Sequence, residues 1–143
     1  MKRTEYNKEY YTKNREKRKS ASLKYKQALD NRDRFARTSI YTHRAKGFDV
    51  RIKPPELFAK ALKTPNCEIC GQELVYYKGG RKGPNQNSAS LDRMNNGKII
   101  TSDNVLILCW QCNVTKGNRT MVEFYEYCKF IAGKDLSRWF EKT

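Results

Sequence analysis

Two Cys-x-x-Cys pairs constrain the fold of this chain more than any other feature of its sequence. The first pair is Cys67 and Cys70, the second is Cys109 and Cys112, and 38 residues separate them. Each pair places two thiols on one tight turn, and two such pairs supply the four soft ligands of a tetrahedral zinc site. Four protein ligands leave no position for water, so we expect one structural zinc ion per chain rather than a catalytic one.

The alternative for these cysteines is four buried or redox-active thiols, which the paired spacing makes the weaker interpretation. Binding zinc to such a site contributes on the order of 10 kcal/mol or more to folding, which decides whether a small domain folds. The fifth cysteine, Cys128, lies on the apolar side of an expected helix. We expect Cys128 to pack in the core.

The chain carries a large excess of positive charge. Of its 143 residues, 30 are Lys or Arg and 15 are Asp or Glu, a formal net charge of +15. This charge favours a polyanionic partner, with nucleic acid first and an acidic membrane surface second. No apolar run approaches the roughly 18 residues of a membrane helix, so we expect no membrane partner. The charged N-terminus carries no secretory signal, which predicts an intracellular protein, cytoplasmic or nucleoid-associated and not secreted.

The N-terminal third is the more basic part of the chain. Residues 4–37 contain no Pro or Gly and are rich in helix formers, which predicts a long helix with a break near residues 20–22. Its apolar stripe is too ragged to drive burial. One interpretation is a solvated charged helix. The one we favour is that residues 1–46 form an arm that contacts the phosphate backbone of a nucleic acid. The candidate nucleic-acid-binding residues are Arg15, Lys17, Arg18, Lys19, Arg32, Arg34, Arg37 and Arg44, together with Arg81, Lys82 and Lys116 further along the chain.

The rest of the chain divides at its turn signals and cysteine pairs. Residues 47–64 should form a linker and a short helix that begins near Pro54 and Pro55. A capping box at Thr120 and Glu123 predicts a helix in a C-terminal segment, residues 120–143. Between these segments we expect, in chain order, a knuckle at 67–71, a strand at 73–77, a mobile basic loop at 79–87, a short strand at 90–92, a turn at 95–97, an apolar run at 105–108 and a helix ending at Gly117.

Several polar residues stand in register with the two cysteine pairs. They are Asp92 followed by Arg93, then Asn104, then Asn113 directly after the last cysteine of the pairs. With these motifs, residues 65–119 resemble the HNH, or ββα-metal, nucleases. The match is closest to a branch that has Asp-Arg where most members have Asp-His, as in phage HNH proteins and some rare-cutting HNH restriction enzymes. The resemblance implies an α+β fold with a zinc-stapled ββα-metal core, preceded by the basic helix and followed by C-terminal helices.

The resemblance also implies an activity and a second metal. It predicts a metal-dependent DNA endonuclease that hydrolyses phosphodiester bonds and uses Mg or Mn. Asp92 and Asn113 would be the protein ligands of this cation, and Asn104 would brace a loop and orient the neighbouring catalytic group. The residue types suit the task, because carboxylate and amide oxygens are hard ligands for a cation that also grips phosphate.

The sequence departs from the family pattern at the general base. Arg93 has no free acceptor and stays charged, so it cannot take a proton, although it can clamp a phosphate. Relatives with Asp-Arg often have a Tyr eight positions after the Asp, where this chain has Ile100. His43 is the candidate base, although alignment through Gly47 puts Phe48 nearer to that place. Activation of water by the cation, without a protein base, is the other alternative.

Two further functions are compatible with the same motifs. One is a catalytically silent zinc-binding protein of the HNH fold that binds DNA or RNA within a larger assembly. The other is a basic scaffold or ribosome-associated protein whose ligand is RNA. Duplex DNA is the favoured partner, and the oligomeric state is left open, with a homodimer among the alternatives.

Overall fold

The computed structural model describes residues 3–28, 30–76, 85–97, 99–135 and 137, and within them the chain is mixed α+β. Five helices and one two-stranded antiparallel sheet are found in these residues. The expected basic loop lies largely outside them, and so do Arg81, Lys82 and Tyr77. No helix in this part of the chain is long and apolar enough to cross a membrane.

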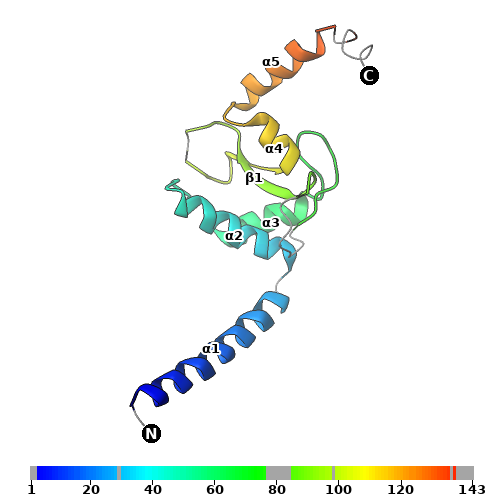
Figure 1. Cartoon of the computed structure of the whole chain (residues 1–143). Coiled ribbons are helices and arrows are strands. Elements are labelled where there is room, and N and C mark those ends of the chain that lie inside the picture. The colour runs from blue at the N-terminus through cyan, green and yellow to red at the C-terminus, as the bar shows by residue number, and fades with distance from the viewer. Residues whose placement is uncertain (1–2, 29, 77–84, 98, 136, 138–143) are drawn as a thin grey trace.

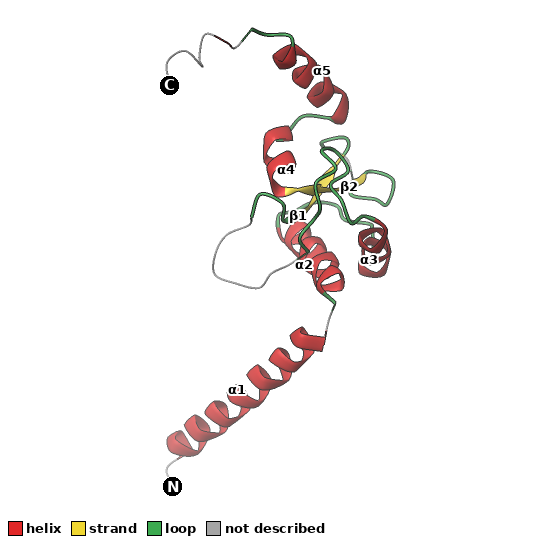
Figure 2. Ribbon diagram, turned by 90° about the vertical axis from the view of Figure 1, so that its right-hand side faces the viewer, coloured by secondary structure: helices red, strands yellow, loops and turns green. Residues whose placement is uncertain are grey.

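Helix α1 (Arg3–Ala28) stands out from the folded body as a rod (Figures 1 and 2). Its residues 3–28 contain nine basic and three acidic side chains and few apolar ones. Tyr10 and Tyr11 are exposed, and so is nearly every described side chain between residues 8 and 23. The chain forms a helix here because nothing interrupts its helix formers, while the lack of an apolar stripe leaves that helix outside the core.

The helical region breaks near Asp30, about ten residues later than the sequence suggested. Asp30 is the N-cap of α2 (Asn31–Ala45), and its side chain accepts a 2.7 Å hydrogen bond from the backbone N–H of Arg32. Ser20 instead bonds the carbonyl of Lys17 within α1, as serine can inside a helix. An acid at an N-cap therefore sets the break, and the expected break at 20–22 is wrong.

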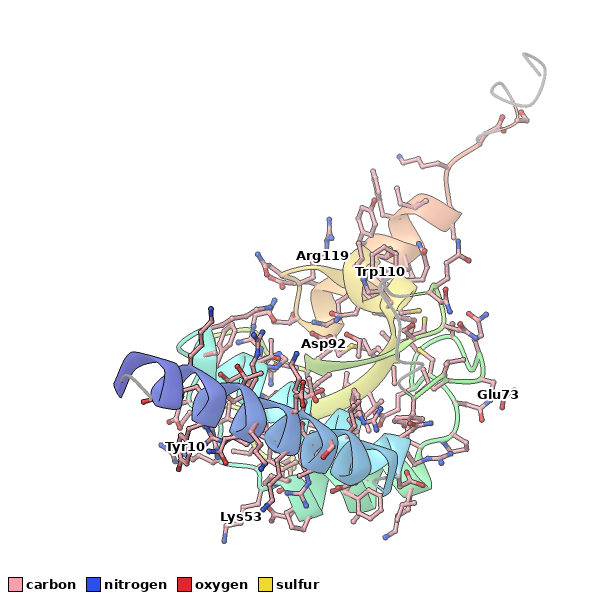
Figure 3. All side chains as sticks on the ribbon, turned by 60° about the horizontal axis from the view of Figure 1, so that its bottom comes forward. Tyr10, Lys53, Glu73, Asp92, Trp110 and Arg119 are labelled. Atoms are coloured by element: carbon pink, nitrogen blue, oxygen red, sulfur yellow. The ribbon has the colours of Figure 1, made fainter. Side chains whose placement is uncertain are left out.

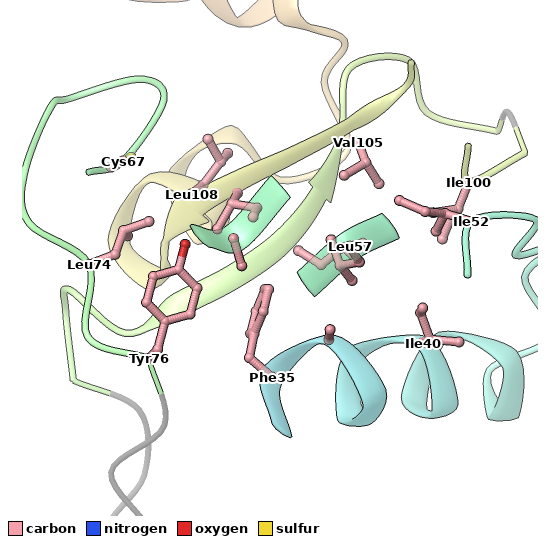
Figure 4. Packing of buried hydrophobic residues seen from close by; sticks show 14 of the residues in the cluster. Phe35, Ile40, Ile52, Leu57, Cys67, Leu74, Tyr76, Ile100, Val105 and Leu108 are labelled. Atoms are coloured by element: carbon pink, nitrogen blue, oxygen red, sulfur yellow. The ribbon is translucent and has the colours of Figure 1, made fainter. Parts of the chain in front are cut away.

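The core lies between α2, α3 (Pro54–Lys63) and the hairpin (Figure 4). Phe35 and Ile40 of α2 face Leu57 of α3 and the strand residue Val105, and all four are buried. The second half of the expected basic arm is thus part of the core. The expected short helix is confirmed as α3, which begins with two prolines and has Glu56 accepting from the N–H of Lys53 at 2.7 Å.

The hairpin consists of β1 (Ala89–Arg93) and β2 (Val105–Cys109), and β2 leads directly into α4 (Trp110–Lys116). These elements confirm the strand expected at 90–92, the apolar run and the helix ending at Gly117, whose φ is +55°. The strand expected at 73–77 does not form over its described residues. Val75 makes one bridge to Ser88 just before β1, whereas Glu73 bridges to Asn66 and the N–H of Leu74 donates to the carbonyl of Pro65, so no continuous ladder forms.

Helix α5 (Met121–Ala132) extends away from the body on the side opposite α1 (Figure 1). Its capping box is confirmed, with Thr120 Oγ1 accepting from the N–H of Glu123 at 3.2 Å and a Glu123 oxygen accepting from the N–H of Thr120 at 2.7 Å. Phe124 is its buried residue among those described. The prediction that Cys128 packs in the core is wrong, because α5 leaves the body and Cys128 is exposed.

The different environments of α1 and α2 predict different effects of truncation. Removing residues 1–28 should leave the melting temperature within about 3 °C of the full chain, because α1 adds little buried surface. Removing residues 1–46 should abolish cooperative unfolding, because each large apolar core side chain contributes about 2–5 kcal/mol and several are lost together. Thermal melts followed by circular dichroism measure both. Equal melting temperatures for the two truncated proteins would contradict the placement of α2 in the core.

Candidate functional site

The four cysteines of the two pairs come together in one cluster. Their sulfur atoms all lie within 4.8 Å of one another, and the Cys70 and Cys109 sulfurs are 3.8 Å apart. A zinc ion about 2.3 Å from each of four thiolates has sulfur–sulfur edges of about 3.8 Å. The cluster therefore fits one tetrahedral zinc ion and leaves no ligand position for water.

Local hydrogen bonds form the two knuckles. In the first, the N–H of Cys67 donates to the carbonyl of Gln72 at 2.8 Å, and Gly71 turns the chain with a φ of +74°. In the second, Cys109 is the N-cap of α4, and its sulfur accepts from the N–H of Cys112 at 3.3 Å. Each Cys-x-x-Cys pair is thus oriented by its own turn. This is why the spacing of the cysteines alone predicted the zinc site.

The thiols differ in how readily they ionise. Burial opposes ionisation of Cys67, but backbone N–H groups of Cys109, Cys70 and Ile69 outweigh it and lower the pKa of Cys67 to about 7. Burial raises the pKa of Cys109 and of Cys112, and neighbouring thiols add to the rise. Without metal, the thiols of Cys109 and Cys112 therefore keep their protons at neutral pH, and a zinc ion has to displace them.

A glutamate next to the first knuckle ties that knuckle to the hairpin. Glu68 Oε2 accepts a 2.5 Å hydrogen bond from the N–H of Ile107 in β2, and Glu68 Oε1 forms a 3.0 Å ion pair with Lys60 of α3. Knuckle, hairpin and α3 are therefore connected by one side chain. This role of Glu68 was not predictable from the sequence, because a glutamate inside a Cys-x-x-Cys turn has no signature of its own.

Asp92 lies on β1 in the middle of the folded body and is buried (Figure 3). Its Oδ2 is 2.9 Å from the Nζ of Lys116, which is 0% exposed. The pair is at ion-pair distance without hydrogen-bond alignment, and neither atom has a hydrogen-bond partner among the described residues. The ammonium of Lys116, a predicted nucleic-acid contact, is therefore buried against a carboxylate and not presented at the surface.

Asn113 lies near Asp92, over the same face of β1. Its side-chain Nδ2 donates to the hydroxyl of Ser90, and among the described residues no hydrogen bond to its amide oxygen is found. Ser90 and Asp92 alternate along β1 and share a face, while Asn113 and Lys116 are three residues apart on α4 and share a side. Helix α4 thus crosses β1 with Asn113 over Ser90 and Lys116 over Asp92. The two expected cation ligands come from neighbouring positions of this contact.

Asn104 holds the loop between the two strands. Its Oδ1 accepts from the N–H of Asn95 at 3.0 Å, and its Nδ2 donates to the carbonyls of Asn95 at 3.4 Å and Ile99 at 3.2 Å. This is the geometry of a loop brace. The expected turn at 95–97 is also found, with Gly97 at a φ of +75°.

His43, Phe48 and Arg93 form a stack beside Asp92. The Arg93 guanidinium lies 4.4 Å from the centre of the Phe48 ring, and the His43 ring centre lies 5.6 Å from that of Phe48. His43 and Phe48 were the two alternatives for the position of the general base. The structure places them side by side, and Phe48 contacts both His43 and Arg93. A guanidinium over an aromatic face is held by the ring quadrupole, which restrains Arg93.

His43 is set up as a neutral imidazole. Its Nδ1 lies 2.8 Å from the carbonyl of Ser39, and a carbonyl can only accept, so Nδ1 carries the proton. Burial, together with the positive charges of Lys46 and Arg93, lowers the pKa of His43 below 6.5. The hydrogen bond to Ser39 and the negative charge of Asp92 raise this pKa, but by less. At neutral pH the ring is therefore uncharged, with a lone pair at Nε2. These charge effects also place His43 within electrostatic range of Asp92 and Arg93.

The remaining basic candidates that the structure describes fall into two groups, on α1 and on α2. Those on α1 are exposed: Arg15, Lys17, Arg18 and Lys19. Those on α2 serve the fold as well, because Arg32 lies 4.9 Å over the Tyr76 ring, Arg37 pairs with Asp33 at 2.9 Å and Arg44 donates to the carbonyl of Val50. Arg34 is half-buried. The α1 residues are therefore the most accessible to a partner.

Comparison of the chain with protein-family models, with curated proteins and with solved structures gave no match.

The cysteine cluster predicts a clear effect of zinc removal. Purified protein should contain about one zinc ion per chain, and exhaustive chelation should unfold the region 67–117, because the lost binding energy is of the order of the whole stability. Cys70→Ser should lose the ion, whereas Cys128→Ser, at an exposed thiol outside the cluster, should keep it. Zinc content and circular dichroism measure both effects. Unchanged spectra after complete zinc removal would contradict a structural role for the cluster.

Proposed function

We propose that the chain is a metal-dependent nuclease of the HNH type that hydrolyses phosphodiester bonds in duplex DNA. The observation that carries the proposal is the contact between α4 and β1. It brings the carboxylate of Asp92 and the amide of Asn113 to neighbouring positions, with Arg93 next to Asp92 in β1 and His43 within range of the charges of Asp92 and Arg93. These residue types suit the binding of a hard cation and a phosphate at one place.

The donor atoms of this site fit a Mg or Mn ion. Asp92 provides a carboxylate, and Asn113 provides an amide oxygen that its bond to Ser90 does not engage. A cation held there would polarise a phosphate and offset the charge that develops during an in-line displacement. Asn104 keeps the loop after β1 in place, so the end of β1 that carries Asp92 and Arg93 is held in a fixed position.

The neighbouring side chains have separate tasks in this proposal. Arg93, restrained over Phe48, clamps a phosphate oxygen and stabilises negative charge in the transition state. His43, neutral and protonated at Nδ1, accepts a proton from the attacking water at Nε2. This division avoids the difficulty that Arg93 cannot act as a base, because the base comes from α2 and not from β1.

Helix α1 would supply affinity rather than chemistry. Its exposed lysines and arginines, interleaved with Tyr10 and Tyr11, are suited to contact phosphates without reading bases. The rod stands away from β1, the strand that carries Asp92, so its contacts would lie on a different stretch of the nucleic acid (Figure 1). Such contacts depend on salt and not on sequence.

A second candidate is a catalytically silent module that binds nucleic acid. The observation in its favour is the Asp92–Lys116 ion pair, which already gives the carboxylate a positive partner. Such a protein would use the zinc-stapled fold for its shape and the basic helices for affinity. The two candidates differ in whether phosphodiester bonds are broken.

Cleavage of supercoiled plasmid distinguishes the two candidates. With Mg or Mn, the zinc-loaded wild-type protein should nick or cut the plasmid, and Asp92→Asn should lower the rate about a hundredfold or more, since the cation provides several kcal/mol of transition-state stabilisation. Asp49→Asn is the matched control, because it makes the same change at an exposed carboxylate that pairs with Arg51, and it should keep the wild-type rate. Binding of intact DNA without cleavage by any of the proteins would favour the silent module.

The role of His43 predicts a particular pH profile. Its lowered pKa means that the ring loses its proton below pH 6.5, so the cleavage rate should rise with pH in that region and level off above it. His43→Asn keeps a donor for the Ser39 carbonyl but has no base, and should lower the rate by about 10²–10⁴ and remove the rising limb. Zinc content is checked at each pH, because acid also protonates thiolates. An unchanged profile in His43→Asn would assign the proton transfer elsewhere.

A further inference from the structure

Lys116 is an unusual lysine, because its whole side chain is buried. It is 0% exposed and its ammonium contacts Asp92, which is itself nearly buried. Fully buried lysines are rare, and a buried ion pair of this kind often stabilises a fold no better than apolar residues of similar size. The pair therefore calls for an explanation other than stability.

The charges on the face between β1 and α4 supply such an explanation. On the face of β1 that α4 covers, Asp92 is the acidic residue and Lys116 the basic one, because Arg93 follows Asp92 in the strand and lies on its opposite face. These two charges cancel, so the pair offers no net negative charge to a metal ion. Mg and similar ions are usually held by one or two carboxylates together with substrate phosphates. Here the single carboxylate already has an ammonium partner at 2.9 Å.

We infer that Lys116 is an internal cation that competes with a divalent metal for Asp92, so that the metal binds there only together with nucleic acid. The inference rests on the proposed cation site of Asp92 and Asn113. In the free protein, the ammonium occupies one carboxylate oxygen and repels a second positive charge. A bound phosphate adds negative charge at the same place, which offsets the repulsion between the two cations. Lys116 is thus a positioning residue that sets the order of binding, not a catalytic one.

This coupling has a reciprocal consequence. If nucleic acid raises the affinity of the site for the metal, the metal raises the affinity for nucleic acid by the same factor. A protein that works this way does not carry an activated cation when no substrate is present. Removing the ammonium should uncouple the two events, because Asp92 then lacks a partner and takes up the metal alone.

The first test measures metal binding without nucleic acid. The full-length, zinc-loaded protein is melted with and without millimolar Mn²⁺. The wild-type melting temperature should change by less than about 1 °C, whereas that of Lys116→Met should rise by at least about 4 °C, because the ion then stabilises the folded state by mass action. Lys129→Met, which removes a lysine from an exposed ion pair, should behave like wild type. Equal stabilisation of wild type and Lys116→Met, or of neither, would overturn the inference.

The double variant Asp92→Asn/Lys116→Met identifies the binding site. It removes both charges of the pair, so its melting temperature should not respond to Mn²⁺. A response as large as that of Lys116→Met would show that the ion binds elsewhere, which would also overturn the inference.

The second test does not depend on whether Lys116→Met folds. Fluorescence anisotropy gives the Kd of a labelled DNA hairpin with and without Mn²⁺ at constant ionic strength, with intact DNA verified on a denaturing gel. Divalent ions alone weaken binding by competing at phosphates. Relative to Asp92→Asn, wild type should gain at least about fivefold in affinity when Mn²⁺ is added. Identical ratios for the two proteins would overturn the inference.

These measurements separate this inference from the proposed function. Coupling of metal and DNA without any cleavage would support the role of Lys116 and reject the nuclease. Cleavage that depends on Asp92, without coupling, would support the nuclease and reject the role of Lys116.

Discussion

The folded part of the chain depends on the connection between the first knuckle and the end of the hairpin. The four sulfur atoms lie within 4.8 Å of one another, and Glu68 bonds the N–H of Ile107 beside them. The core of the described residues is small, because α2, α3 and the two strands each contribute only a few buried side chains. A core of this kind is marginal by itself, so we expect metal binding to be a substantial part of the folding free energy. The cluster also fixes where α4 starts, because Cys109 is both a member of the cluster and the N-cap.

The site follows from that starting point through two periodicities. Helix α4 begins at a fixed place at the end of β2, and β2 pairs with β1 in a register that sets Asp92 opposite Leu106. Residues three apart on the helix then meet residues two apart on the strand. The contacts of Asn113 with Ser90 and of Lys116 with Asp92 are therefore determined together. A shift of one residue in the hairpin would move Asp92 to the other face of the sheet, away from α4.

The sequence predicted these features unequally, for physical reasons. The sequence predicted the cysteine cluster, α3, β1, α4 and the capping box of α5, because each has a local signature. It did not predict that β1 pairs with β2, because pairing between distant segments has no local signature. The break at Asp30 was misplaced because an N-cap acid among many charged residues is hard to distinguish. The partnership of Asp92 and Lys116 was not predicted, because it depends on the crossing of two elements that are distant in sequence. The burial of α2 and the exposure of Cys128 are tertiary outcomes, since ragged apolar stripes do not specify which helix finds a partner.

The distribution of charge along α4 bears on how a polyanion would approach. A zinc ion with four thiolates carries a formal charge of −2, and Cys109 would place it at the N-terminal end of the helix. Lys116 lies at the opposite end, against Asp92, which Arg93 follows in β1, and Asn113 lies between the two ends of the helix. We expect phosphates to be repelled from the cluster and attracted to the other end. The structural metal would thereby do more than hold the fold together, because its negatively charged ligand set orients the polyanion toward the end of α4 where Asp92 is paired.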